Sequence, residues 1–314
     1  MLHVLGIDAG GTKTVCQLAD EQARVLAEAR GGGANLQASG ELEVEKVLHQ
    51  VMEDALGERG IVPAAICLGM AGVDREADLA IIRGFMARIG HKAKVLVVND
   101  ALIALEAGVG DAPGVVIIAG TGSIVYGRNA RGEAVRAGGW GYLLGDEGSG
   151  YWMGRLALRA VVREADRRGR TTSLTPRVLE HFNAGRPSDL IHEVYAHALR
   201  PTAIAALARH VQAAAAEGDT VAAGIIEAGA QALVSAAEAV AGRLGLQGAT
   251  FDFVLAGGIF QAVPLLAQDM SRLLPPVAPR ARIQLLGHEP AAGAVRLALA
   301  EARGAAGVPV YKSD

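Results

Sequence analysis

The hydrophobic positions of this chain change their period along the sequence. Continuous or alternating apolar runs predict strands at Leu2 to Asp8, Thr14 to Asp20 and Arg24 to Arg30. Polar residues and glycines separate these runs, so we expect a three-stranded meander. In the next segment, residues 41–56, apolar side chains recur at helical spacing, starting with Val44 and Val47. The chain therefore begins with three strands followed by a helix.

After the meander, predicted strands alternate with predicted helices. Strands are expected at residues 64–70 and 94–98, with helices at residues 76–89 and opening at residues 101–107. Strands that alternate with helices in this way are joined by crossover connections. The first part of the chain is therefore expected to form a mixed sheet covered by helices.

The order of elements then starts again. Strands are predicted at residues 115–119, 124–128 and 133–137, before a long helical tract from about residue 150 to 244 with interruptions near Thr171, Arg186 and Gly218. A strand at 250–255, a helix at 259–273, a strand at 282–286 and a helix at 290–303 complete the copy. The scheme is βββαβαβα twice, with a helical insertion in the second copy. The copies share the pattern and no visible sequence identity.

Glycine, aspartate and proline gather between the two copies, at residues 108–114. Such clusters mark turns and linkers. We therefore expect two domains, residues 1–112 and residues 113–314, with the helical insertion at about residues 150–245. A chain of 314 residues is long enough for two domains.

The composition narrows the classes of function. The net charge is −3 and aromatic residues make up 4%, so the chain shows neither a basic face nor stacking platforms for nucleic acid. Cys16 and Cys67 stand in apolar strand-like runs without zinc or iron–sulfur spacing, and are expected to be reduced core residues. Neither a signal peptide nor an apolar span of membrane length is visible, so a soluble, cytoplasmic protein without a membrane partner is expected.

Two glycine turns carry the most informative chemistry. Asp8-Ala9-Gly10-Gly11-Thr12-Lys13-Thr14 and Gly120-Thr121-Gly122-Ser123 each lie between two predicted strands. Glycine has no Cβ and tolerates positive φ, so successive N–H groups can converge on an anion, with hydroxyl groups beside them. Neither turn has the P-loop or dinucleotide spacing, and each alone is compatible with an ordinary hairpin. As a pair they indicate a cleft that grips a polyphosphate from both sides.

Two aspartates follow predicted strands and are candidate catalytic groups. A carboxylate at Asp8 would lie close to bound phosphates, which favours a role in holding Mg²⁺, directly or through water. The alternative for Asp8 is an ordinary Asx turn. Asp100 follows Asn99 at the end of a strand, where a general base could take the proton of a substrate hydroxyl. The alternative for Asp100 is a helix N-cap, and both roles are compatible.

Two further glycine-rich segments are candidates for ligand contacts. Residues 138–150, Gly138-Gly139-Trp140-Gly141-Tyr142-Leu143-Leu144-Gly145-Asp146-Glu147-Gly148-Ser149-Gly150, are too rich in glycine for regular structure. They are typical of a loop that wraps a small polar ligand, although Asp146 could also cap a helix. Ala256-Gly257-Gly258-Ile259 stands at a strand-to-helix turn, where glycines allow a flat adenine or ribose to approach, or a helix to pack closely.

With these motifs the chain resembles the sugar-kinase and actin superfamily. More narrowly, it resembles the N-acetylglucosamine kinase branch of the BadF/BadG/BcrA/BcrD ATPase family over nearly its whole length. The two glycine turns are similar to the family's phosphate motifs, Asn99-Asp100-Ala101 to its catalytic segment, and Leu255-Ala256-Gly257-Gly258 to its adenosine motif. The narrowest match is the loop of residues 138–150. The resemblance implies two actin-like, ribonuclease H-like α/β lobes around a central nucleotide cleft.

The resemblance also implies a set of site residues. Asp100 would be the catalytic base and Asp8 the Mg²⁺ residue. The implied ATP contacts are Gly10, Gly11, Thr12, Lys13, Thr14, Gly120, Thr121, Gly122, Ser123, Gly257 and Gly258. The implied sugar contacts are Asn35, Gly72, Asp74, Asp100, Thr121, Trp140, Gly141 and Asp146. The expected reaction is ATP-dependent phosphorylation of an amino sugar, with N-acetylglucosamine and its 6-hydroxyl favoured.

Several alternatives remain open at the level of sequence. Leu36 and Gln37 follow Asn35 where eukaryotic relatives carry an aromatic residue, and Ala71-Gly72-Val73-Asp74 replaces a Ser-Gly-Gly-Asp pattern, so glucosamine or N-acetylmuramic acid are alternative substrates. An ATPase that activates a 2-hydroxyacyl-CoA dehydratase would need cysteines for a cluster. A sugar-sensing regulator is disfavoured because no helix-turn-helix precedes the first strand. The family resemblance and the long helical tract suggest a homodimer.

Overall fold

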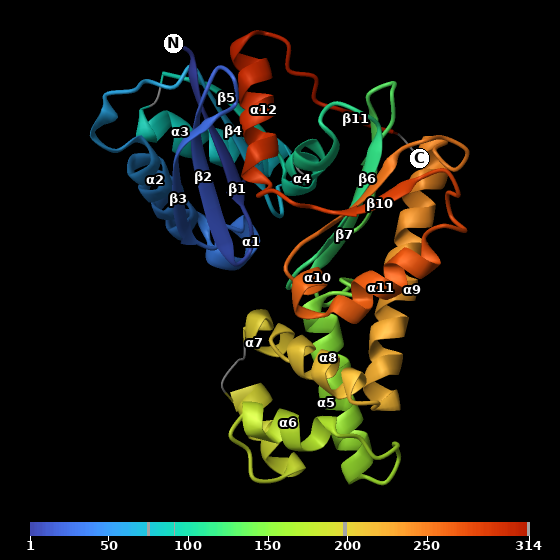
Figure 1. The fold of residues 1–314 in the computed structure, drawn as a ribbon. Helices are drawn as coiled ribbons and strands as arrows, with labels where there is room; N and C mark the ends of the chain where they lie inside the picture. Colours follow the sequence, from blue (N-terminus) through green and yellow to red (C-terminus); the bar gives the residue numbers. More distant parts are fainter. Residues whose placement is uncertain (74–75, 91, 197–199, 313–314) are drawn as a thin grey trace. The chain divides into compact units, whose positions relative to one another are not determined.

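The computed structural model describes residues 1–73, 76–90, 92–196 and 200–312 (Figure 1). The first half contains β1 (His3–Ala9), β2 (Lys13–Asp20), β3 (Val25–Gly32), α1 (Leu36–Ser39), α2 (Glu41–Leu56), β4 (Ala65–Met70), α3 (Glu76–Ile89), β5 (Lys94–Asn99) and α4 (Asp100–Val109). Every strand and helix expected for residues 1–107 is present, and α2 and α3 have the expected bounds. The short helix α1 was not expected from the sequence.

The second half repeats the scheme. It contains β6 (Gly114–Ala119), β7 (Ser123–Arg128), β8 (Glu133–Gly138), α5 (Gly150–Ala165), α6 (Leu174–His181), α7 (Pro201–Ala205), α8 (Ala208–Ala216), α9 (Thr220–Leu244), β9 (Asp252–Ala256), α10 (Ile259–Ala262), α11 (Pro264–Leu273), β10 (Arg282–Leu285), α12 (Ala291–Ala302) and β11 (Val310–Tyr311). The helix expected at 259–273 is split, because Pro264 lacks a backbone donor and starts a new helix. β11 was not expected.

The strands form two sheets. The first has the order β3-β2-β1-β4-β5 and the second the order β10-β9-β6-β7-β8-β11. In the first sheet β1 pairs antiparallel with β2 and parallel with β4, which in turn pairs parallel with β5. The mixed sheets with crossover helices confirm the expected α/β class and the repeated βββαβαβα order.

Contacts divide the chain into two compact units that interleave in sequence. One unit is residues 1–116, 126–135 and 284–314, and the other is residues 117–125 and 136–283. The units are defined by contacts alone, and the lobe boundary expected at residues 112/113 stays a prediction.

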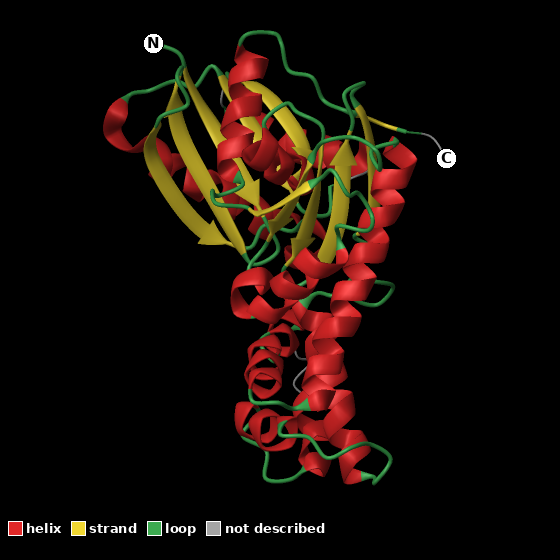
Figure 2. Ribbon diagram, turned by 45° about the vertical axis from the view of Figure 1, so that its right-hand side comes forward, coloured by secondary structure: helices red, strands yellow, loops and turns green. Residues whose placement is uncertain are grey.

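The first unit is built around the five-stranded sheet, with helices on both of its faces (Figure 2). A core of fully buried side chains, including Leu5, Ile7 and Leu68, packs with residues of α2 and α3 such as Leu48 and Phe85. The central strands β1 and β4 are almost wholly buried, which explains their near-continuous apolar sequence, whereas the outer strand β3 is mostly exposed.

On the first sheet's other face, α12 and α4 pack closely together and against β1 and β4. A Cβ on Gly6 would lie 2.4 Å from the backbone nitrogen of Val295, and one on Gly293 would lie 1.9 Å from the carbonyl oxygen of Ile103. Neither position has room for a methyl group. The last long helix of the chain is therefore fixed against the first strand and against the helix that begins at Asp100 (Figure 1).

In the second unit, α9 packs against α5, α8 and α11. Within the described part of the chain, this helix alone is long and apolar enough to cross a membrane. Its residues Ile226, Leu233 and Val240, each about two turns from the next, are buried in the unit. Core helices of soluble proteins share this length and composition.

Candidate active site

In the first unit, the strand ends bring several predicted site residues to one edge of the sheet. Ala9 at the end of β1 lies beside Met70 at the end of β4, which lies beside Asn99 at the end of β5. The three strands are parallel, so the segments that follow them leave at the same edge. Gly72 and Asp100 therefore lie on the same side of the sheet as the first glycine turn.

Asp8 is a buried carboxyl at this edge, with 9% of the residue exposed. Burial, the nearby charge of Asp100 and, to a smaller extent, that of Glu289 raise its pKa to about 7, against the opposing effect of Lys13. An isolated buried carboxylate is unfavourable, so the site favours a proton or a cation beside Asp8.

Asp100 is the first residue of α4 and is half-buried. The N-cap of this helix is Asn99, whose side-chain oxygen accepts a hydrogen bond of 2.8 Å from the N–H of Ala101. The capping role considered for Asp100 therefore belongs to its neighbour. The role of Asp100 as a base stays a prediction. The charge of its carboxylate raises the pKa of Asp8 at the same edge of the sheet.

The first glycine turn is open to solvent. Gly11, Thr12 and Lys13 are exposed, and a Cβ on Gly11 would meet nothing within 4 Å. The turn is closed by a hydrogen bond of 3.0 Å from the N–H of Gly10 to the carbonyl of Lys13. No other described group packs on the outer side of the turn at Gly11, so a phosphate could approach it there.

Two other predicted residues flank this turn. Thr14 is fully buried, and its hydroxyl donates to the carbonyl of Gly32 over 2.7 Å, which joins β2 to β3. Asn35 follows Ala34, whose N–H donates to the carbonyl of Gly10 over 2.9 Å. Asn35 is thus next to the turn in space, although 25 residues separate it from Gly10 in the sequence.

The predicted sugar residues after β4 are described only in part. Gly72 is exposed and has a φ of 76°, a left-handed conformation that favours glycine. The N–H of Ala71 donates to the carbonyl of Ala9 over 3.1 Å, so the segment starts beside the end of β1. Asp74 lies outside the described residues.

In the second unit, the second glycine turn is firmly tied to the loop of residues 138–150 and to the start of α5. The carbonyls of Gly120 and Thr121 accept hydrogen bonds from the N–H groups of Gly150 and Tyr151, over 2.9 and 3.2 Å. The hydroxyl of Ser123 donates to the carbonyl of Glu147 over 2.8 Å. The turn and the loop therefore form one hydrogen-bonded structure.

Asp146 is at the centre of this structure. The residue is buried and adopts a φ of 61°. Burial raises the pKa of its carboxyl, whereas hydrogen bonds from the backbone N–H groups of Ser123 and Gly141 act in the opposite direction. A Cβ on Gly122 would lie 2.6 Å from its Oδ2. The N-cap of α5 is Ser149, not Asp146, because the Ser149 hydroxyl accepts from the N–H of Trp152 over 3.2 Å.

The remaining predicted residues of this unit have distinct surroundings. Trp140 is 64% exposed, and the guanidinium of Arg136 lies 4.9 Å from its ring centre. Gly141 is exposed with a φ of 83°. Gly257 has a φ of 100°, and a Cβ there would lie 2.2 Å from the carbonyl oxygen of Ala119, directly before the second turn; Gly258 is exposed. The segment predicted to bind adenosine and the second turn are therefore neighbours.

Sequence reasoning missed one charged residue of the first unit. Glu289 accepts hydrogen bonds from Lys13 and Arg30, each over 2.8 Å. Lys13 and Glu289 are 276 residues apart, so no local spacing could have linked them. Among the described residues, no group of three or more His, Cys, Asp or Glu side chains forms a ready-made metal site.

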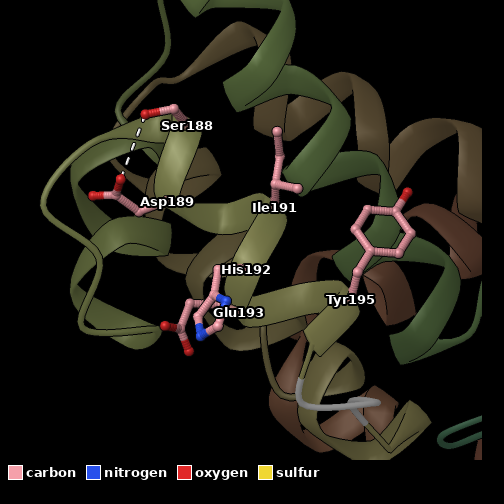
Figure 3. A pocket seen from close by; sticks show the side chains of 6 residues that line it. All are labelled: Ser188, Asp189, Ile191, His192, Glu193 and Tyr195. Carbon is pink, nitrogen blue, oxygen red and sulfur yellow. Dashed lines mark hydrogen bonds between the residues drawn. The ribbon is translucent and has the colours of Figure 1, made fainter.

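An open hollow of about 760 Å³ lies elsewhere in the second unit (Figure 3). It is lined by Ser188, Asp189, Ile191, His192, Glu193 and Tyr195. None of these is a predicted site residue, and the lining segment ends beside residues 197–199, which are outside the described part of the chain. The hollow is separate from the chemistry considered above.

The architecture is that of the actin-like sugar kinases. A protein of Chromobacterium violaceum described as a candidate N-acetylglucosamine kinase superposes with a TM-score of 0.74 at 27% identity, over 95% of this chain and 99% of that one. The model of the BadF/BadG/BcrA/BcrD ATPase family matches residues 5–298. The chain belongs to this family.

Two relatives cover nearly the whole chain. The N-acetylmuramic acid/N-acetylglucosamine kinase of Clostridium acetobutylicum is 36% identical over 304 residues, 96% of this chain and 99% of its own. The N-acetyl-D-glucosamine kinase of Dictyostelium discoideum is 34% identical over 311 residues, 94% of this chain and 97% of its own. The family resemblance expected from the motifs is confirmed.

Proposed function

We propose that this protein is an ATP-dependent kinase that phosphorylates an amino sugar, with N-acetylglucosamine as the substrate and its 6-hydroxyl as the acceptor. The observation that carries the proposal is the edge of the first sheet, where β1, β4 and β5 end in register. Asp8, an open glycine turn and Asp100 all belong to this edge. Family membership and the names of the two relatives support the same activity.

Asp100 is proposed to accept the proton of the sugar hydroxyl as its oxygen attacks the terminal phosphorus of ATP. Phosphoryl transfer has a loose transition state, so the protein contributes mainly positioning and electrostatic stabilisation. The N–H groups of the first turn and the ammonium of Lys13 would stabilise the charge on the phosphate oxygens. Closure around the substrates would exclude water, which would otherwise compete with the sugar hydroxyl.

The residues at this edge fit a divalent cation. Asp8 and Asp100 repel each other, and the pKa of Asp8 is raised to about 7 by burial and by this repulsion. A Mg²⁺ ion commonly uses one or two carboxylates together with water and substrate phosphates, so a larger protein cluster is unnecessary. When bound, the ion would neutralise phosphate charge. Asp8 is the residue we propose to hold it, directly or through water.

The second unit is proposed to supply the remaining contacts. Gly120 to Ser123 would bind phosphate and Gly257 to Gly258 the adenosine, while Trp140, Gly141 and Asp146 would contact the sugar. The carbonyls of Gly120 and Thr121 accept hydrogen bonds from the start of α5, which supports a turn that is rigid before the ligand binds.

N-acetylmuramic acid is a second candidate substrate, because the relative from Clostridium acetobutylicum carries both sugars in its name. An activating ATPase with a shared iron–sulfur cluster is disfavoured. Cys16 and Cys67, the two cysteines of the chain, are fully buried, and burial raises the pKa of both thiols, that of Cys16 to about 12. Such thiols are poor ligands for a cluster at a surface.

The direct test is the release of ADP from ATP and Mg²⁺ with a panel of acceptors. The panel contains N-acetylglucosamine, N-acetylmuramic acid, glucosamine, glucose and no sugar. We expect selective acceleration by N-acetylglucosamine, and mass spectrometry should show one added phosphoryl group. A rate that does not depend on sugar would contradict the kinase and favour the activating ATPase. Nucleotide binding without turnover would favour a sensor.

We further propose that the protein is cytoplasmic and forms a homodimer, the assembly that the family resemblance suggests. Sedimentation velocity at micromolar and nanomolar concentrations tests the assembly. A mass of two chains is expected, and a monomer at every concentration would contradict the dimer.

A further inference from the structure

Glu289 forms a bridge between two cations beside the first glycine turn. Its Oε2 lies 2.8 Å from Nζ of Lys13, and its Oε1 lies 2.8 Å from Nη2 of Arg30. The side chain of Glu289 is 25% exposed, whereas those of Lys13 and Arg30 are 53% and 54% exposed. Both oxygens of the carboxylate are thus engaged by basic groups that solvent can reach.

Glu289 precedes the tightly packed helix α12, whereas Lys13 lies on the exposed first turn. Glu289 stands two residues before α12 begins at Ala291, and its carbonyl accepts from the N–H of Ala292 over 3.0 Å. α12 itself packs on β1 and α4 without space for a methyl group at Gly6 or Gly293. Lys13, in contrast, extends from the exposed end of the turn on a long flexible side chain. The backbone that carries Glu289 is therefore held in place, while the ammonium of Lys13 can move toward a ligand.

The charges show that the carboxylate is an anion when no ligand is present. Burial alone would raise the pKa of Glu289, but hydrogen bonds from Lys13 and Arg30, together with their charges, hold it below the usual range. The Glu289 carboxylate is therefore already paired with the Lys13 ammonium, the group proposed to bind phosphate at the first turn.

We propose that Glu289 is a positioning residue that holds Lys13 in the resting protein and competes with the nucleotide phosphates for its ammonium. Lys13 leaves Glu289 when a nucleotide binds and returns to it when the product departs. Glu289 therefore weakens the binding of ADP. This inference rests on the proposed function, because it requires the first turn to bind a nucleotide.

The test compares ADP binding to the wild type and to Glu289→Gln by isothermal titration calorimetry. Mg²⁺ is omitted, which separates the effect on Lys13 from any effect on a cation at Asp8. Glutamine keeps the size and one acceptor oxygen but removes the charge. We expect the variant to bind ADP about two- to fivefold more tightly, the range for a partly exposed ion pair. The gain should shrink at high salt, because exposed charges are screened.

A matched control is Glu28→Gln. Glu28 pairs with Arg30 over 2.8 Å and has no contact with Lys13 among those described for it. This variant removes one carboxylate from the same arginine, so ADP affinity should not change. A second control repeats Glu289→Gln in a Lys13→Met background. There the substitution should have no effect, because the ammonium for which Glu289 competes is gone.

The outcomes separate this inference from the proposed function. A wild type that binds neither ADP nor ATP overturns both. A wild type that binds ADP, with Glu289→Gln binding it equally or more weakly, leaves the nucleotide site in place and overturns the competition. A lower Tm with unchanged affinity would give Glu289 a purely structural role and overturns it as well. Tighter binding that persists without Lys13 would mean that Glu289 acts through its general field, which also contradicts the competition.

Discussion

The two glycine turns share a strand-turn-strand setting and differ in what surrounds them. The first turn is open, with nothing within 4 Å of a Cβ on Gly11. The second turn is open at Gly120 but packed at Gly122, where a Cβ would lie 2.6 Å from Asp146, and its carbonyls and the Ser123 hydroxyl are bonded to the following loop and to α5. Similar glycine motifs therefore serve different needs. The first leaves its backbone accessible to a ligand, and the second also holds a neighbouring loop in place besides the phosphate contact proposed for it.

The carboxylates beside the two turns also differ in how their surroundings affect their charge. Asp8 and Asp100 raise each other's free energy as anions, which suits groups that await a proton or a cation. Asp146 is buried too, but backbone N–H groups of Ser123 and Gly141 stabilise its charge. Substitutions at the first turn should thus affect chemistry, and those at the second turn should affect stability.

The largest expected effect is that of Asp100→Asn. Loss of a general base typically lowers kcat by about 10²–10⁴-fold. The helix should stay intact because its cap is Asn99, and the repulsion of Asp8 is relieved, so the Tm should not fall. Steady-state ADP release with saturating sugar measures the loss. The control is Asp111→Asn, an exposed position beyond the other end of α4. Near-normal turnover of Asp100→Asn would remove this residue from the role of base.

The next effect concerns pH and Asp8→Asn. The pKa of Asp8 rises from 3.8 to about 7 on folding, so between these values the folded state binds more protons than the unfolded state. The contribution of Asp8 to the stability of the wild type therefore falls as pH rises from about 4 to about 7, and this loss is complete above pH 8. A shift of about three units corresponds to roughly 4 kcal/mol as an upper bound.

Asparagine does not ionise, so Asp8→Asn should be more stable than the wild type without ligand, by a margin that grows over this pH range and then levels off. Urea denaturation at pH 4, 5, 6, 7 and 8 measures it. The same variant should lose activity, because its proposed cation residue is gone. A difference in the free energy of unfolding that stays constant from pH 4 to pH 8 would show that folding does not raise the pKa of Asp8.

Gly122→Ala should destabilise the protein by about 1–3 kcal/mol, because the methyl group would displace the Asp146 carboxylate from its backbone donors. Chemical denaturation measures the change. The double variant with Asp146→Ala removes the obstacle, so the two losses should not add. Additive losses would mean that the close approach does not matter.

Gly11→Ala is the matched substitution at the first turn and should have the smallest effect on stability. Since the space around it is empty and its φ is not in the left-handed region, the change should stay within about 1 kcal/mol of zero. The KM for ATP should rise, because a methyl group would stand where phosphate approaches. A large loss of stability would show that the first turn is as constrained as the second.

Much of the fold could be predicted from local patterns. The apolar spacing in residues 41–56 and 76–89 defined α2 and α3, and the continuous apolar strands indicated burial on both faces. The sheet edge with Asp8, the first turn and Asp100 also followed, because parallel strands bring their ends together. These features depend on neighbours in the sequence or on regular pairing.

What could not be predicted depends on contacts between distant segments. Glu289 reaches Lys13 across 276 residues, and the packing of α12 on Gly6 depends on a fit that no spacing encodes. The hydrogen bonds from the N–H groups of Ser123 and Gly141 to Asp146 likewise depend on a loop conformation with several left-handed residues. Such details are set by tertiary packing rather than by the propensities of single segments.

The position of α12 has a consequence for how the protein is made. During synthesis, β1 emerges first, but the helix that covers its Gly6 face is translated almost three hundred residues later. Until then the nascent amino-terminal segment carries an uncovered apolar surface, which is the kind of surface that chaperones recognise. An expression fragment that stops before Ala291 should therefore aggregate, however complete its nucleotide-binding motifs are.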